Sequence, residues 1–149
     1  MRSPARWVAV VMVVAAGMSA LGREQTGEAV LTVKVVDVRN HKGDLIFGVF
    51  KTGDGFPKEK SKSVNWQVKA AGDAVVFTAK LPPGRYGASV LHDENRNGQM
   101  DKDALGIPVE GYGVTNNPKP AMRAATFEEA LFTLPKEGKE MTISIQYFR

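Results

Sequence analysis

Acidic and amide side chains alternate along a stretch of the chain that begins at Asp93. With Asp93 as position one, the positions that matter for metal binding hold Asp93, Asn95, Asn97, Gly98, Gln99 and Asp101. Alternate oxygen-bearing side chains can curl around a hard cation, the glycine permits the bend, and position seven needs only a backbone carbonyl. Oxygen ligands without cysteine favour calcium and suit the stricter octahedral geometry of magnesium less well. The spacing therefore predicts a calcium site in the loop 93–103.

This loop departs from an EF-hand in two respects. Position twelve is Ala104, where a bidentate glutamate would bind, and no helical pattern flanks the loop. Asp103 or the more distant Glu110 would have to supply the missing carboxylate. Because few ligands are charged, we expect weak binding, with a Kd on the order of 10⁻⁴ to 10⁻³ M. The alternative is an asparagine-rich hairpin without an ion, since Asn, Asp and Gly also dominate ordinary turns.

His92 directly precedes the loop and is the obvious candidate for catalysis. We expect it to be structural, with its ring bonded to a backbone carbonyl of the loop so that it orients the loop from behind the ligands. A metal-assisted hydrolase that uses His92 and the loop acids is the alternative. The chain has only two histidines, too few for a typical transition-metal site. Ser89 lacks the G-x-S-x-G motif of a nucleophile elbow, so we expect a protein that is not an enzyme.

A glycine-rich segment, residues 105–118, follows the acidic loop. One interpretation is a lid that packs onto the sandwich edge and closes the ion site, with Gly98, Glu110 and Tyr112 in supporting positions. The other is a ligand surface for a carbohydrate or a peptide, on which Tyr112 presents an aromatic face and Asn116 and Asn117 present amides. The sequence favours the lid and leaves the binding module as the alternative function.

The elements that must position these residues are short strands. Alternation of apolar and polar residues, or enrichment in β-branched residues, marks the segments 29–38, 45–51, 64–70, 74–81, 85–92 and 139–148. Residues 126–134 fit either a strand or a helix, and we favour a strand because the segment is short. Glycine and proline turns separate the segments. The pattern predicts an all-β fold, a single antiparallel β-sandwich of about seven strands, transthyretin-like or immunoglobulin-like.

The connection between the strands at 85–92 and 126–134 is unusually long. It spans about 35 residues, and a loop of that length in a compact domain is usually functional or is held by something. Both the acidic loop and the glycine-rich segment lie within it. Any site on this domain is therefore expected at this end of the sandwich.

The N-terminus has the layout of a secretory signal peptide. Arg2 and Arg6 precede an apolar run from Trp7 to Met18, and small residues follow. We expect residues 1–22 to be the signal and residues 29–148 to be the domain, in the periplasm or secreted. An uncleaved anchor is the alternative, although the run is short for a membrane span of about 20 residues. After cleavage no membrane span is expected.

The composition of the chain limits the classes of molecule that we expect it to bind. The net charge is +4, and removal of the signal would take two arginines with it. Lysines at 58, 60 and 62 cluster without interleaved aromatic residues, so nucleic acid is not expected as a partner. The chain has no cysteine, which excludes disulfides and a lipoprotein anchor. The expected partners are cell-envelope proteins or glycans.

The run HDENRNGQMDKDALGIPVEGYGVTNN, from His92 to Asn117, resembles the bacterial domain-of-unknown-function family 2141. The segment GVFKTGDGFP, from Gly48 to Pro57, is similar to the second strand and loop of that family. The resemblance covers about residues 30–147. It implies an exported domain with a transthyretin-like or carboxypeptidase-regulatory-like sandwich, and it implies no activity. The loop is more distantly similar to the calcium loops of surface-protein B-repeats, in which an acid stands where this chain has Asn97.

Overall fold

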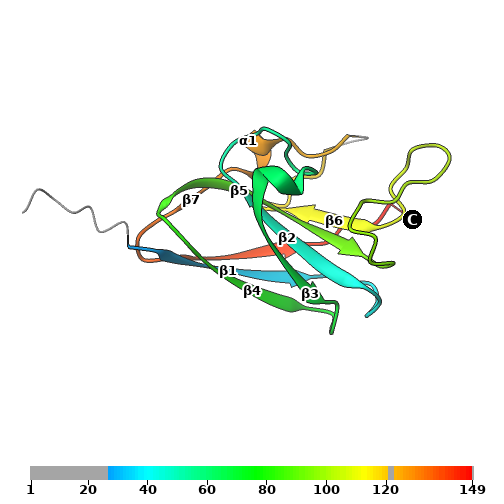
Figure 1. Ribbon diagram of the computed structural model, residues 1–149, viewed down its shortest axis with the longest axis horizontal. Helices are drawn as coiled ribbons and strands as arrows, with labels where there is room; N and C mark the ends of the chain where they lie inside the picture. Colours follow the sequence, from blue (N-terminus) through cyan, green and yellow to red (C-terminus); the bar gives the residue numbers. More distant parts are fainter. Residues whose placement is uncertain (1–26, 121–122, 149) are drawn as a thin grey trace, which may run out of the picture.

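Two β-sheets pack face to face in the structure, a computed structural model that describes residues 27–120 and 123–148 (Figure 1). The smaller sheet has the strand order β4-β1-β8, and the larger has the order β3-β2-β5-β6 with β7 paired to β5. The strands are β1 (Ala29–Val36), β2 (Asp44–Phe50), β3 (Ser63–Lys69), β4 (Val75–Leu81), β5 (Gly84–Asp93), β6 (Gly111–Val114), β7 (Phe132–Leu134) and β8 (Lys139–Ser144). The predicted all-β sandwich is confirmed.

The smaller sheet follows the alternation of its sequence. In β1 the side chains of Leu31, Val33 and Val35 are buried, and the residues between them face outward. β1 pairs with β4 in antiparallel register, with Val33 opposite Phe77, and with β8 in parallel register, with Val33 opposite Met141. The outer face of this sheet is polar or exposed, as a half-buried sheet requires. The parallel pairing of β1 and β8 is the one departure from antiparallel pairing among the described strands.

The larger sheet is apolar on both faces of its central strand. Leu45, Phe47 and Val49 of β2 face the core, where the Phe47 ring stacks on Phe77 of the opposite sheet with centroids 4.9 Å apart. Ile46 and Phe50 point to the other face and are also buried. Something must therefore cover the outer face of this sheet, because two buried faces require a third layer.

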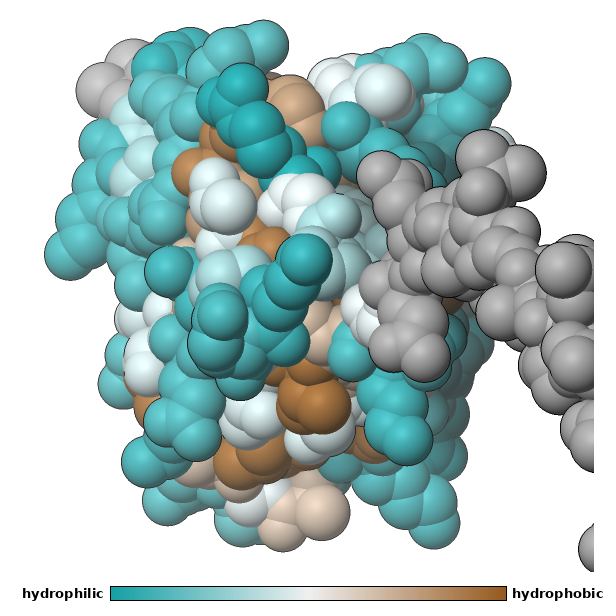
Figure 2. All heavy atoms as spheres, turned by 90° about the vertical axis from the view of Figure 1, so that its left-hand side faces the viewer, coloured by the Kyte–Doolittle hydropathy of each residue, from teal (hydrophilic) through white to brown (hydrophobic). Residues whose placement is uncertain are grey.

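The third layer consists of the long connection and a short helix. The helix α1 (Phe127–Ala130) packs on the outer face of β5, where the absence of a side chain at Gly87 admits the Phe127 ring. The loop 94–110 covers the other end of the same face (Figure 1). Seen from the end at which β1 begins, hydrophobic residues show mainly toward the middle of the molecule, with hydrophilic residues along both sides (Figure 2).

Two elements differ from the prediction. Residues 126–134 were expected to form one strand, but a capping box between Thr126 and Glu129 starts the helix α1, and only the end of the segment forms β7. The long connection contains β6, which was not predicted because four residues with two glycines carry no strand signal. Gly111 permits β6 to approach the C-terminal segment closely, since a Cβ there would lie 2.2 Å from the Tyr147 ring.

The expected signal segment, residues 1–22, lies outside the described residues. Within residues 27–120 and 123–148, no helix has the length and apolar character needed to cross a membrane.

Candidate functional site

The loop that follows β5 is held by two buried carboxylates. Asp93 is fully buried, and its carboxylate accepts hydrogen bonds from the backbone N–H groups of Asn97 (3.1 Å) and Gly98 (2.6 Å). Glu110 is 4% exposed and accepts from the N–H groups of Glu94 (2.8 Å) and Asp101 (3.1 Å). Glu110 thereby ties the start of the loop to its middle. Burial raises the pKa of Glu110, and the nearby charges of Asp101 and Asp93 add to that shift against the two hydrogen bonds.

Three of the predicted ligand side chains meet in the middle of the loop. The Asn97 amide donates to the Asp101 carboxylate at 2.8 Å, and the Asn95 amide donates to the other carboxylate oxygen. The amide oxygens of Asn95 and Asn97 accept from backbone N–H groups two residues further on, at 3.0 and 2.9 Å. Gly98 has a φ of 78°, so the glycine makes the predicted bend. The residues at positions three, five and nine are therefore brought together.

Of the other predicted ligands in the loop, Asp103 bonds to the following turn, whereas Gln99 borders the cluster. The Asp103 carboxylate accepts from the N–H groups of Leu105 and Ile107 at 2.9 and 3.0 Å, and so shapes the next turn. The backbone N–H of Gln99 donates to the amide oxygen of Asn97, and Gln99 lines a groove beside the loop. In the described part of the chain, no group of three or more His, Cys, Asp or Glu side chains is arranged to hold a metal ion.

His92 is a buried residue that links β5 to the β1–β2 turn and to the C-terminal segment. It is fully buried, and its Nε2 lies 2.8 Å from the carbonyl oxygen of Lys42, which can only accept. Nε2 therefore carries the hydrogen, and Nδ1 accepts from the Tyr147 hydroxyl at 2.7 Å. The predicted ring-to-carbonyl bond is present, although the carbonyl belongs to the β1–β2 turn and not to the acidic loop. The hydrolase alternative requires an exposed His92, and here both ring nitrogens are engaged in the interior.

Arg39 links the loop to the β1–β2 turn at the same end of the sandwich. The Arg39 guanidinium lies 4.5 Å from the centre of the Tyr147 ring, donates to Glu94 at 2.6 Å and donates to the carbonyl oxygen of Val109 at 2.9 Å. Burial alone would raise the pKa of Glu94, but the hydrogen bond and charge of Arg39 outweigh it and leave the pKa below its ordinary value. Arg39 therefore joins both ends of the loop to the β1–β2 turn.

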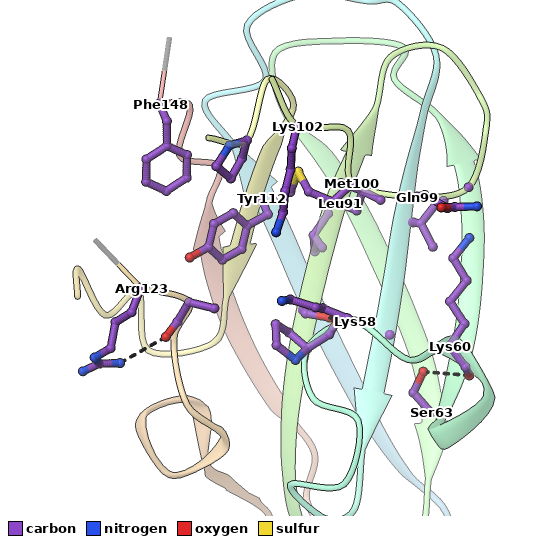
Figure 3. Close-up of a pocket in the computed structure, with 18 of the residues that line it drawn as sticks. Lys58, Lys60, Ser63, Leu91, Gln99, Met100, Lys102, Tyr112, Arg123 and Phe148 are labelled. Atoms are coloured by element: carbon purple, nitrogen blue, oxygen red, sulfur yellow. Dashed lines mark hydrogen bonds between the residues drawn. The ribbon is translucent and has the colours of Figure 1, made fainter. Parts of the chain in front are cut away.

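A groove of about 620 Å³ lies on the outer face of the larger sheet, beside this loop (Figure 3). Its floor is formed by β2 and β5, which contribute Ile46, Gly48, Phe50, Ser89 and Leu91. Gly48 and Ser89 are paired across the two strands, so the smallest side chains lie side by side in the floor. A Cβ at Gly48 would lie 3.2 Å from the side chains of Asn65 and Ser63, so even one added carbon would crowd the floor. Small residues at paired positions thus make the hollow.

The walls of the groove come from segments far apart in the sequence. One wall is the loop, with Met100, Lys102, Leu105, Ile107 and Pro108. The opposite wall is the connection between β2 and β3 together with the start of β3, with Pro57, Lys58, Lys60, Ser63 and Asn65. Tyr112, Phe148, Arg123 and Ala124 line the remaining end, where the Tyr112 and Phe148 rings stack with centroids 5.8 Å apart. Most of the lining side chains are apolar.

The predicted ligand surface of the glycine-rich segment is only partly formed. Tyr112 lines the groove, and burial raises the pKa of its hydroxyl. The Asn116 amide donates to the carbonyl oxygens of Glu129 and Leu131, and the Asn117 side chain bonds to the backbone of Thr142 and Ser144. Asn116 and Asn117 therefore hold the glycine-rich segment to neighbouring backbone. Tyr112 lines the groove, but the two asparagines do not.

Sequence reasoning missed the groove itself. Its walls join residues near 60 with residues near 100, and no local pattern reports such proximity. One signal was available: β2 reads as apolar on both faces, which implies that its outer face is covered. The small outward residues Gly48 and Ser89 would then mark where that cover leaves a hollow.

Comparisons with known proteins agree with the resemblance of the sequence. No curated protein and no solved structure matched the chain. The sequence model of a family described as an uncharacterized protein conserved in bacteria, DUF2141, matches residues 33–144, and the chain therefore belongs to this family.

Proposed function

We propose that this domain is an exported, non-enzymatic binding module that takes a small ligand with an apolar body into the groove beside the loop 93–110. The observation that carries the proposal is the groove itself. Its volume of about 620 Å³ lies in the range of small-molecule sites, roughly 300–1,000 Å³. Export is supported by the pattern of residues 1–22.

The floor of the groove explains why an apolar body would bind. Ile46 and Leu91 are contributed by neighbouring strands, are paired in register, and present aliphatic surface. Tyr112 adds an aromatic face at one end. A ligand that covers these side chains removes apolar surface from water at about 25 cal/mol per Å². The sheet backbone behind them is fully paired, so the floor is already formed before a ligand arrives.

The test is titration of the isotope-labelled protein with decanol, a neutral probe with a linear apolar body, followed by NMR. We expect backbone shifts at Gly48, Leu91 and Met100. Gly48→Val should weaken binding at least tenfold, because a branched side chain fills the floor; its Cβ would press on Asn65 and Ser63, so the amide spectrum of the variant must also match that of the wild type away from the groove. Thr78→Val on the outer face of β4 is the matched control and should bind as wild type. Equal binding by Gly48→Val and wild type would contradict the proposal.

A second role, calcium binding by the loop 93–103, is favoured by the convergence of Asn95, Asn97 and Asp101. The four side chains of Asp93, Asn95, Asn97 and Asp101 offer only oxygen ligands once the amides turn their oxygens inward. Each carboxylate oxygen of Asp93 has one lone pair beyond that used by the backbone. The donor set therefore fits calcium, which would replace the amide–carboxylate bonds with ligand bonds and stiffen one wall of the groove.

Thermal unfolding in chelator and in millimolar calcium tests this role. Calcium at about ten times the Kd of a weak site stabilises the native state by roughly 1.4 kcal/mol, which is a shift of about 5 °C for a domain of this size. Magnesium should do less at equal concentration. Asp101→Asn should abolish the shift, because it removes a charged ligand, whereas Asp73→Asn, an exposed control, should keep it. Identical unfolding of the wild type in chelator and calcium would contradict the calcium role.

A further inference from the structure

The charged residues around the groove are all cationic. Its lining includes Lys58, Lys60, Lys102 and Arg123, and among the described residues that form it there is no aspartate or glutamate. The loop forming one wall carries several acids, but none of them lines the groove: Asp93 and Glu110 are buried beneath the loop, and the partly exposed Asp101 and Asp103 bond to groups of the loop itself. The fold therefore presents apolar side chains and positive charge to the same hollow, while it turns the carboxylates away.

The three lysines differ from the arginine in their partners. Arg123 is held by Glu129, with contacts of 2.8 and 2.9 Å, and Figure 3 shows its guanidinium pointing away from the groove. None of the ion pairs found within residues 27–120 and 123–148 includes Lys58, Lys60 or Lys102. Lys62, two residues beyond Lys60, lies outside the groove and pairs with Asp54 at 3.1 Å. Unpaired ammonium groups are thus found on the groove side of this segment.

The lysines come from opposite walls and extend over the same floor. Figure 3 shows the Lys102 side chain reaching from the loop and the Lys58 side chain reaching from the facing wall, both toward the space beside Tyr112 and Leu91. Lys60 lies toward the other end of the groove, near Gln99, and a Cβ placed on Gly98 would be 3.0 Å from its Nζ. Two cations aimed at one space repel each other unless an anion lies between them.

From this arrangement we infer that the ligand of the groove is an anionic amphiphile, a small molecule whose apolar body covers Ile46 and Leu91 and whose carboxylate or phosphate group binds between Lys58 and Lys102. The inference rests on the proposed binding function and names its ligand class. Lysine suits this role because its aliphatic stem can lie along an apolar floor while its ammonium group meets the anion. A charge-assisted hydrogen bond is about twice as strong as a neutral one.

Calorimetric titration of the purified protein with four probes of one chain length tests the inference. The probes are decanoate, decyl phosphate, decanol and decyltrimethylammonium. We expect each anion to bind at least tenfold more tightly than decanol, the cation to bind more weakly than decanol, and the preference for anions to fall as salt is added. The ratio of decanoate to decyl phosphate affinity then tells a carboxylate ligand from a phosphate ligand.

Two double variants complete the experiment. Lys58→Gln/Lys102→Gln should bind decanol as wild type does and lose the preference for anions. Lys34→Gln/Lys80→Gln makes the same charge change on the exposed outer face of β1 and β4 and should retain that preference. Equal affinities for decanoate and decanol, or a preference that survives in the groove variant, would overturn the anionic ligand and leave an apolar groove. Binding of none of the four probes would overturn the proposed binding function as well.

Discussion

Two segments bound the groove, and a glutamate holds each of them in a different way. In the loop 93–110 the carboxylate of Glu110 is buried and accepts two backbone N–H groups. In the segment 123–130 the carboxylate of Glu129 is partly exposed and accepts from the Thr126 N–H at 2.8 Å and from the Arg123 guanidinium. Burial raises the pKa of Glu110, whereas the Arg123 hydrogen bonds lower the pKa of Glu129 to about 2.

The opposite pKa shifts of Glu110 and Glu129 show what decides the ionisation of a carboxylate that holds a segment in place by hydrogen bonds. Both glutamates accept hydrogen bonds that favour the charged form. Glu129 bonds directly to the cation of Arg123, whereas Glu110 has no hydrogen bond from a cation, interacts with Arg39 only at longer range, and has Asp93 and Asp101 nearby. Without a directly bonded cation, the loss of hydration at Glu110 outweighs its two backbone hydrogen bonds. A cation bound in the loop would supply the missing charge, which connects the acidity of Glu110 to the calcium role.

The largest expected effect on stability follows the substitution of Asp93, the buried carboxylate that holds the start of the loop. Asp93→Ala should lower the free energy of unfolding by about 3 kcal/mol, because it removes two charge-assisted bonds and leaves the Gly98 N–H without its acceptor, while the Asn97 N–H keeps only the Asn95 amide oxygen. The melting temperature should fall by about 10 °C. Urea unfolding in chelator measures the change. Asp73→Ala, whose side chain is 93% exposed, is the matched control and should change stability by less than about 0.5 kcal/mol. A loss no larger than that of the control would mean that Asp93 is not an anchor.

A smaller effect on stability, which depends on pH, is expected when Glu110 is substituted. The folded pKa of Glu110 lies above the ordinary value of 4.5, so the native state binds this proton more tightly than the unfolded chain does. Its contribution to stability is full below pH 4.5 and is lost as the pH rises through the folded pKa. Glu110→Gln should therefore destabilise by roughly 1–2 kcal/mol at pH 4, and the deficit should shrink toward pH 7.

Urea unfolding of the Glu110→Gln protein and of the wild type between pH 4 and pH 7, with chelator present, measures this trend. Glu137→Gln changes an exposed residue in the β7–β8 turn and should show a deficit near zero at every pH. A Glu110→Gln deficit that grows as the pH rises would mean that the folded pKa is lowered, and that the loop already holds a compensating charge.

The sandwich was predictable because its signals are local. The alternation in β1 and β8 and the apolar character of both faces of β2 indicate burial directly; the structure has strands in these three segments, although β8 ends at Ser144, before the predicted end at residue 148. The start of α1 is also local, since Thr126 and Glu129 form a capping box, but the alternation of Ala130, Phe132 and Leu134 and the shortness of the segment favoured a strand. The error at 126–134 is one of weighting, because a cap of two residues competes with a longer apolar pattern.

The site was predictable only in part, and the division follows sequence separation. Asn95, Asn97 and Asp101 are close in the chain, and their side chains meet in the structure, while Asp93 holds the backbone of the same loop. Asn116 and Asn117 were assigned to a ligand surface, but their amides bond to backbone contributed by residues 129–144, which local sequence does not reveal. Lys58 and Lys102 face each other across the groove although they are far apart in the sequence, so local sequence does not reveal this arrangement either. Proximity across the sheet, and not residue type, was the missing information.

The smallest expected effect is at the exposed glutamate of the second segment. Glu129 has a folded pKa of about 2 against an ordinary value of 4.5, so its contribution to stability is full above pH 4.5 and is lost as the pH falls toward 2. Glu129→Gln should lower the melting temperature by about 1–2 °C at pH 6, because exposed pairs contribute little. The deficit should close between pH 4.5 and pH 2.5, which is the opposite trend to that of Glu110→Gln. Glu128→Gln, the neighbouring exposed acid with the same charge change, is the control and should show no such closure. A Glu129→Gln deficit that persists unchanged at pH 2.5 would contradict the lowered pKa, and the two segments would then be held in the same way.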